Sequence, residues 1–207
     1  MPFYVVLLAA LGAFFIAVIQ ASFFEWCFHR YWLHRPWLPK DVFTAHTLVH
    51  HQLCKFDDTF EVTEEEQHEA LHFQWWGGPF LILLNVIPWA AVGIALGGLG
   101  IKLPVLAMTL GVVVAFAIYY AGYEGFHYLM HKPSIPWLER RAFFQFLKRH
   151  HRIHHVQMDR NLNVLLPIAD FFLGTLVLEA PVPAVTPDSA RRLARRHSRS
   201  ASRRQSL

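Results

Sequence analysis

The sequence predicts an all-α membrane protein, in which several transmembrane helices carry a histidine-rich helical cap on the cytosolic side. Three observations predict this fold class. Hydrophobic residues make up 54% of the 207 residues and charged residues only 16%, against about 25% charged residues in an average soluble domain. Three long segments contain no charged residue, and each exceeds the about 20 residues that cross a bilayer. All 14 histidines lie outside those segments.

The charge-free segments are residues 1–24, 73–101 and 103–123. From them we expect transmembrane helices at about 3–24, 76–97 and 103–123. The first segment lacks a basic start and has a longer apolar run than a cleaved signal peptide, so we expect it to remain as a helix. The other two segments predict a hairpin, because glycines, Lys102 and Pro104 form a turn between them.

The distribution of basic residues predicts the orientation. Every Lys and Arg except Lys102 lies in residues 25–72 or 124–207, and the positive-inside rule makes both segments cytosolic. We therefore expect an integral membrane domain over residues 1–180, with a cytosolic cap formed by 25–72 and 124–180. A bacterial inner membrane and an endoplasmic reticulum membrane fit equally well.

Residues 181–207 are rich in Arg and Ser and have too few apolar residues to pack, so we expect a disordered tail. Attraction to anionic lipid headgroups and a merely solvated tail are equally good interpretations. We expect no nucleic-acid partner, because such a role is unusual for a membrane protein.

Within the cap, prolines and polar residues divide the chain into short pieces. Residues 41–53 predict a short helix. Residues 137–155 predict one basic amphipathic helix along the membrane interface. Residues 162–178 are mainly apolar, but Asn163, Pro167 and Asp170 interrupt them, which predicts a re-entrant or interfacial segment and not a further span.

Ten histidines form four groups near membrane exits or on cap helices. Residues three or four apart share a helical face, and three groups have this spacing. The pair His29 and His34 is five apart and needs a helix end or a local distortion to converge, which the nearby Pro36 could supply. One pair alone would more often be structural, but four groups on one side indicate a metal site, because neutral imidazole suits iron, zinc, copper and nickel. The ten residues are His29, His34, His46, His50, His51, His127, His131, His151, His154 and His155.

The order of these groups resembles the fatty acid hydroxylase superfamily, whose members are membrane-bound di-metal oxygenases and include lipid and sterol hydroxylases and sterol desaturases. His29-Arg30 resembles the His-Arg opening of that family. Tyr123-Glu124 and Leu147-Lys148 resemble the segments before its later histidine groups, and residues 161–175 resemble the segment after the last group. The resemblance covers roughly residues 25–175.

The resemblance implies a di-metal site of two iron ions held by the ten histidines, with zinc as the alternative in purified protein. It implies an O2-dependent enzyme that hydroxylates a fatty acyl, sterol or carotenoid lipid, with desaturation as the alternative on the same core. Electrons must come from a separate reductase, ferredoxin or cytochrome, because the sequence has no Gly-rich dinucleotide fingerprint and no haem-attachment motif.

Two assignments around the site stay open. His150 is the alternative to His151 as a ligand, because it is also four residues from His154, although the family spacing favours His151. Glu124 and Asp170 are candidate partners that orient ligating imidazoles, but each fits equally well as an ordinary acidic residue.

Two other functions fit less well. Residues 68–72 match the zincin motif His-Glu-x-x-His, in which His68 and His72 would bind zinc and Glu69 would act as the general base. A chance match is the better explanation in so histidine-rich a chain. A metal transporter is disfavoured because transporters place ligands near the bilayer midplane, and the three apolar runs contain no His, Asp or Glu.

Overall fold

The computed structural model describes residues 1–55, 59–62 and 71–179. All the regular secondary structure in this part of the chain is helical. Three helices are long and apolar enough to cross a membrane, and they are α1 (Phe3–Phe28), α4 (Gly77–Gly98) and α5 (Val105–His131). The predicted fold class, all-α with membrane-spanning helices and a histidine-rich site, is confirmed. The expected tail over residues 181–207 lies outside the described residues.

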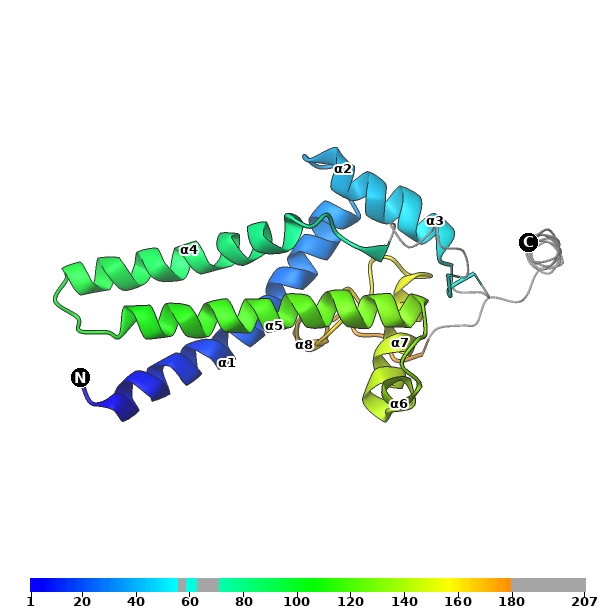
Figure 1. Ribbon diagram of the computed structural model, residues 1–207. Coiled ribbons are helices and arrows are strands. Elements are labelled where there is room, and N and C mark those ends of the chain that lie inside the picture. The colour runs from blue at the N-terminus through cyan, green and yellow to red at the C-terminus, as the bar shows by residue number, and fades with distance from the viewer. Residues whose placement is uncertain (56–58, 63–70, 180–207) are drawn as a thin grey trace, which may run out of the picture.

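Helix α5 is the centre of the long-helix layer, and α1 and α4 both pack against it (Figure 1). Small residues let α1 approach α5 closely, since Ala13, Ala17 and Ala21 lie buried against Val112 and other residues of α5. A Cβ atom at Gly111 would collide with the backbone carbonyl of Ala10 on α1. Close packing through small residues is the usual source of helix association in a bilayer, where burial of apolar surface supplies little.

Two side-chain hydrogen bonds join α1 to α4, and we call this pair the α1–α4 clasp. Trp89 Nε1 donates to Gln20 Oε1 at 2.6 Å, and Gln20 Nε2 donates to Asn85 Oδ1 at 3.2 Å. Asn85 also donates to the carbonyl of Leu81 at 2.9 Å. Side-chain hydrogen bonds of this kind join helices in apolar surroundings.

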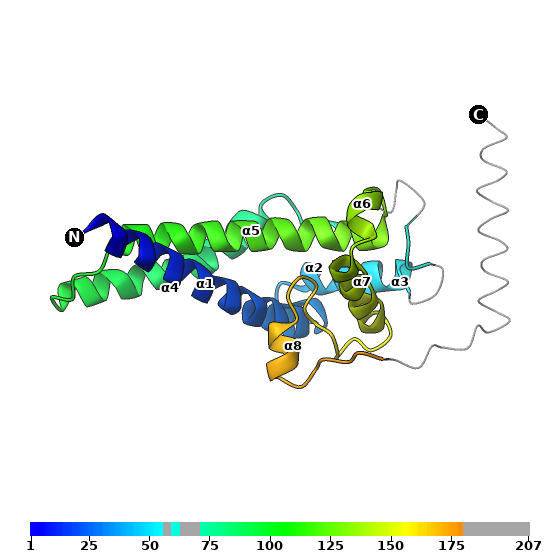
Figure 2. The same ribbon diagram turned by 90° about the horizontal axis from the view of Figure 1, so that it is seen from below.

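The remaining elements gather at one end of the three long helices (Figures 1 and 2). They are η1 (His29–Leu33), α2 (Lys40–Phe43), η2 (Thr44–His50), α3 (His51–Leu53), α6 (Pro136–Glu139), α7 (Ala142–His154) and α8 (Ile168–Phe172). Helix α1 continues directly into η1, and α5 extends eight residues past residue 123, where its charge-free run ends. Both long helices therefore reach from the apolar layer into the cap, where they deliver histidines.

Two cap segments differ from the sequence prediction. Residues 137–155 form two helices instead of one, because the chain is extended at Arg141 (φ −73°, ψ 137°). The Glu139 carboxylate accepts hydrogen bonds from the backbone N–H groups of Ser134 and Ile135, both at 2.6 Å, which stabilises the start of α6. Residues 41–53 are helical as expected, but their central part is a π-helix.

Candidate metal centre

Nine of the ten predicted histidines form two groups that could each hold a metal ion, and in each group the nitrogen atoms lie within 4.8 Å of one another. The first histidine group consists of His29, His34, His46, His51 and His154. The second histidine group consists of His50, His131, His151 and His155. The tenth residue, His127, lies beside the second group, with its Nε2 atom 3.2 Å from Nε2 of His50.

A π-helix explains how His29 and His34 converge although they are five residues apart. In η1 the backbone N–H of His34 donates to the carbonyl of His29 at 3.1 Å, which is the i to i+5 bond of a π-helix. This wider turn places residues five apart on one face. The two rings stack with their centroids 4.9 Å apart. The π-helix η1 is therefore the local distortion that brings His29 and His34 together.

The second π-helix distributes its histidines between the two groups. In η2 and its continuation, His46 and His51 are five apart and their Nε2 atoms are 3.1 Å apart. His50, which the four-residue spacing places on the face of His46 in an α-helix, instead belongs to the second group. The rings of His46 and His50 still stack, with their centroids 5.2 Å apart, so η2 lies between the two groups.

Hydrogen bonds at Nδ1 determine the tautomer of six of these imidazoles. A carbonyl oxygen can only accept a hydrogen bond, so an Nδ1 atom that faces one carries the proton and Nε2 keeps its lone pair. The acceptors are the carbonyls of Leu162 for His29 (2.5 Å), Phe60 for His131 (2.7 Å), Arg160 for His154 (2.8 Å), Leu71 for His127 (3.3 Å) and Cys54 for His155. Thr47 does the same for His34, since its hydroxyl donates to Leu33 (2.6 Å) and accepts from His34 Nδ1 (3.1 Å).

The Nε2 atoms then face one another with their lone pairs. His34 Nε2 and His154 Nε2 are 3.0 Å apart, and neither carries a proton in the tautomers assigned above. Two such lone pairs repel unless a cation lies between them. Ligands about 2.1 Å from one ion and at right angles to each other are ~3.0 Å apart. The Nε2–Nε2 contacts across both groups run from 2.9 Å to 3.2 Å, so the donor set fits a bound metal ion in each group.

Burial keeps these imidazoles in the form that binds metal. Removal from water lowers the pKa of His46, His50, His51, His151 and His155 well below the ordinary value. It also lowers the pKa of His154 to about 4. At neutral pH these rings are therefore neutral, as metal ligation requires.

Of the two candidates on α7, His151 lies in the second group and His150 does not. His150 points away and donates from Nε2 to Asp170 Oδ2 at 3.2 Å, with both side chains almost completely buried. Burial raises the pKa of Asp170, but the hydrogen bonds from His150, Thr175 and the Asn163 backbone outweigh it, so the pKa lies below the usual range.

Asp170 acts on the site through the backbone. It accepts hydrogen bonds from the backbone N–H groups of Leu162 (2.9 Å) and Asn163 (2.8 Å). The carbonyl of Leu162 in turn accepts the Nδ1 proton of His29. Residues 162–178 therefore do not cross the layer of long helices, and they serve as a fixed loop that orients one imidazole.

Within the described part of the chain, Glu124, the other candidate acid, forms no hydrogen bond with any of the ten histidines. Its Oε2 atom accepts a hydrogen bond from Nδ1 of His72 at 3.2 Å. His72 is the last residue of the zincin-like motif, and His68 and Glu69 lie outside the described residues.

Glu25 is a functional candidate that the sequence reasoning missed. It is 7% exposed and accepts hydrogen bonds from the Tyr119 hydroxyl (2.6 Å), the Asn163 side chain (3.1 Å) and the Val164 backbone (2.5 Å). These bonds fix the loop that carries Leu162 against α1 and α5. The available signal was an acidic residue one helical turn before His29, directly after a charge-free helix.

A cavity of about 410 Å3 lies beside the candidate metal centre. Its wall comes from α1, α2, η2, α4, α5 and the segment before α4, and it is mostly aromatic and aliphatic. His46 of the first group and His127 beside the second group both line it. An apolar molecule in this cavity would therefore contact the candidate metal centre directly.

Comparison with known proteins adds one finding. Residues 14–175 match the sequence model of a family described as fatty acid hydroxylase. The matched region contains all ten histidines, Glu25 and Asp170. No curated protein and no solved structure matches the chain.

Proposed function

The chain belongs to the fatty acid hydroxylase family, and on this basis we propose that it is a membrane-bound di-iron oxygenase that hydroxylates a lipid with O2. The observation that carries the proposal is the convergence of imidazole lone pairs in two neighbouring groups, above all the 3.0 Å contact between His34 and His154. Removal of two hydrogens from the lipid is the alternative outcome on the same core.

We assign one iron ion to the first histidine group and one to the second group together with His127. Imidazole nitrogen is a suitable donor for iron and for zinc, so zinc is the alternative in purified protein. When bound, such a metal pair supplies the activation of O2 and the cleavage of an unactivated C–H bond.

The protein's own residues orient the ligands and shape the surroundings. Backbone carbonyls and Thr47 accept hydrogen bonds from Nδ1–H of six imidazoles, which leaves Nε2 of each ring free to bind metal. Glu25 and Asp170 hold the loop that carries one of those carbonyls. The apolar cavity excludes water and brings a hydrocarbon to the same place.

The position of the cavity supports a lipid substrate. Part of its wall belongs to α1, α4 and α5, which are long and apolar enough to cross a bilayer, so a lipid could enter from this side without leaving hydrocarbon. Fatty acyl, sterol and carotenoid substrates all fit this chemistry. We further propose that the site faces the cytosol and that a separate reductase, ferredoxin or cytochrome supplies electrons there.

Lipid profiling of producing cells tests this function. Cells that express the wild-type chain should contain a lipid that has gained one oxygen or lost two hydrogens, compared with cells that express His154→Ala. Identical lipid profiles in the two strains would refute the proposed activity. A loss of activity in Glu69→Gln but not in His151→Ala would instead favour the metalloprotease interpretation.

A further inference from the structure

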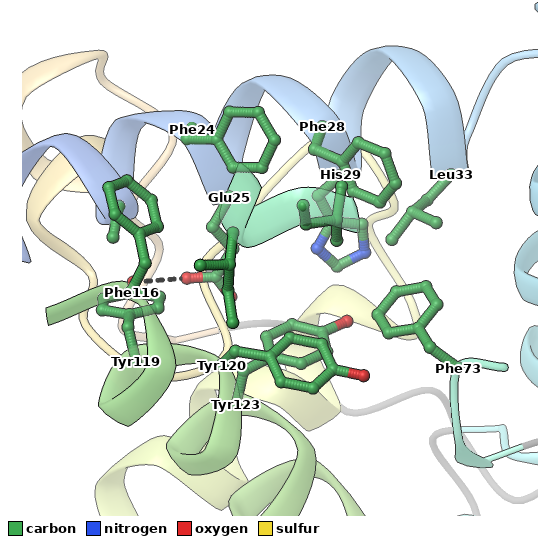
Figure 3. A pocket seen from close by; sticks show the side chains of 13 residues that line it. Phe24, Glu25, Phe28, His29, Leu33, Phe73, Phe116, Tyr119, Tyr120 and Tyr123 are labelled. Carbon is green, nitrogen blue, oxygen red and sulfur yellow. Dashed lines mark hydrogen bonds between the residues drawn. The ribbon is translucent and has the colours of Figure 1, made fainter. Parts of the chain in front are cut away.

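One face of α1 and its continuation η1 lies away from the cavities, and we call it the outer α1 face. Phe23, Trp26 and Arg30 are three and four residues apart, so they share this face. None of the three lines the cavity of about 410 Å3 or a smaller cavity of about 60 Å3 between α1, α4 and α5. Phe24 and Phe28, which lie on the other side of the helix, line both cavities (Figure 3). A ligand on the outer α1 face would therefore be separate from the proposed substrate.

The segment that contains α8 lies along the outer α1 face. Helix α8 packs against α1 (Figure 2), and the rings of Phe23 and Phe172 stack with their centroids 6.4 Å apart. One turn further along α1, Trp26 Nε1 donates to Thr175 Oγ1 at 2.8 Å. Phe171 and Phe172 are 65% and 70% exposed, so the segment presents an apolar surface beside α1 that suits contact with lipid.

Two arginines lie at the cap end of the outer α1 face. The guanidinium carbon of Arg30 lies 5.1 Å from the centroid of the Trp26 ring. The guanidinium carbons of Arg30 and Arg35 lie 6.0 Å and 5.7 Å from the centroid of the Tyr31 ring. Within the part of the chain that the structure describes, neither arginine forms a salt bridge. The aromatic rings therefore hold both cations near one another without neutralising their charge.

A third arginine, Arg160, lies close by. Arg30 Nη1 donates to the carbonyl of Asp159 at 3.5 Å, and Arg160 Nη1 donates to the carbonyl of Gly174 at 2.9 Å. The Asp159 carboxylate lies 3.8 Å from Arg160 Nε, and both side chains are exposed. Three positive charges and one negative charge thus lie together, so the cluster favours an anionic ligand.

The arginines lie at the level of lipid headgroups. The candidate span Phe3–Leu33 has 31 residues and is ~46 Å long, which matches the about 40–45 Å thickness of a bilayer with its headgroups. Phe23 belongs to the charge-free run that ends at residue 24, and Arg30 lies ~10 Å further along the axis. Phe23 therefore lies among acyl chains, Trp26 at the interface and Arg30 beside phosphates.

We propose that the outer α1 face binds one anionic phospholipid from the leaflet on the side of the cap, with its phosphate at Arg30 and Arg35 and an acyl chain along Phe23 and Phe172. The planar guanidinium groups present N–H donors in a fork that matches phosphate oxygens. From Phe23 to Arg30 the face changes from apolar to cationic, in the same order as the acyl chain, the glycerol and the phosphate of the lipid.

The bound lipid stabilises η1. Arg30 directly follows His29, and Arg35 directly follows His34, so a phosphate that contacts both arginines joins the two ends of this π-helix. Both histidines belong to the first histidine group. An anionic lipid therefore slows the loss of metal from that group. This consequence rests on the proposed metal site, whereas the lipid site itself does not.

Native mass spectrometry of the purified full chain tests the lipid site with phosphatidylglycerol and phosphatidylcholine. Both lipids carry a phosphate, but the arginines repel the choline cation of the second lipid. The variants are Arg30→Gln, Arg35→Gln and Phe172→Ser. The control is Arg141→Gln, which removes an exposed arginine between α6 and α7. The Arg-rich residues 181–207 are the same in every variant, so they cannot account for a difference.

The wild type and Arg141→Gln should bind phosphatidylglycerol about tenfold more tightly than phosphatidylcholine, because a hydrogen bond to a charged group is worth roughly this factor or more. Arg30→Gln and Arg35→Gln should lose most of this preference, and Phe172→Ser should bind both lipids more weakly. If Arg30→Gln does not fold, the exposed Arg35 decides. Equal preference in Arg35→Gln and Arg141→Gln would overturn the proposal. Displacement of phosphatidylglycerol by millimolar inorganic phosphate would also overturn it, because it would indicate a site for free phosphate.

The rate of metal release to a chelator tests the effect on η1. Phosphatidylglycerol should slow the release of one ion about tenfold in the wild type and should have no effect in Arg35→Gln. Selective lipid binding with an unchanged rate of metal release would overturn the stabilisation of η1. A wild-type protein that holds no metal would refute the proposed function, and the lipid measurement would still decide the lipid site.

Discussion

Replacing His150 and His151 separately by alanine should have two different effects, although the residues are adjacent on α7. His151 Nε2 lies 3.0 Å from His131 Nε2 and 3.1 Å from His155 Nε2. His150 instead donates to the buried Asp170 carboxylate. We predict that His151→Ala removes a metal ion and that His150→Ala lowers stability but keeps the metal.

The expected sizes follow from these contacts. A hydrogen bond to a charged group contributes roughly 1.5–3 kcal/mol, and Asp170 keeps donors from Leu162, Asn163 and Thr175. Because both side chains are buried, we expect the upper value, about 3 kcal/mol, for His150→Ala. For a chain of this size that corresponds to a fall in Tm of roughly 6–12 °C. Loss of a partner that only orients a ligand weakens metal binding about 10–100-fold, and loss of the ligating nitrogen in His151→Ala should weaken it more.

The assay combines metal analysis and thermal unfolding of each purified variant in detergent. We expect the wild-type metal content and a lower Tm for His150→Ala, and about one ion fewer per chain for His151→Ala. His150→Gln, whose amide can still donate to Asp170, should recover part of the Tm. Loss of metal in His150→Ala with full retention in His151→Ala would refute the assignment of these two residues.

Three further predictions follow from the same geometry. Thr47→Val should weaken metal binding in the first group about 10–100-fold, because His34 loses the partner of its Nδ1 proton. Competition with a chelator measures the metal affinity, which Thr47→Ser should restore. A wild-type affinity in Thr47→Val would contradict the prediction. Gly111→Leu should prevent close packing of α1 on α5 and so reduce the yield of folded protein. Gly12 has open space around it, so Gly12→Ala should leave the yield unchanged. Equal yields of the two variants would show that the close contact at Gly111 is unimportant. The metal-free protein should lose stability as pH falls below about 6.5. Burial lowers the pKa of the histidines in the folded state, in His154 to about 4, so the unfolded state takes up protons first. A Tm that stays constant between pH 6.5 and pH 4 would contradict this prediction.

The sequence predicted the helical class and the three long apolar helices, because their length and lack of charge determine where a chain can cross a bilayer. The apolar runs end at residue 24 in α1 and at residue 123 in α5. Both helices continue past the apolar run into the cap, where polar side chains find buried partners such as Tyr119 for Glu25. Hydropathy identifies the segments that can lie in a bilayer, but it does not identify such hydrogen-bond partners.

Which histidines approach one another depends on backbone geometry that α-helical periodicity misses. The interval of five between His29 and His34 is itself a signal for the i to i+5 turn of η1, and the same interval joins His46 to His51. The course of residues 161–178 was less accessible. It depends on Asn161 in the left-handed region (φ 52°) and on the buried Asp170, whose partners come from α7 and from both ends of the segment.

Metal analysis of the purified wild-type chain tests the central claim most directly. The account predicts about two metal ions per chain, with one lost when His34 is replaced by alanine and the other lost when His131 is replaced, because these residues belong to different histidine groups. The absence of stoichiometric metal from folded wild-type protein would contradict the account. Loss of both ions in each variant would contradict the division into two groups.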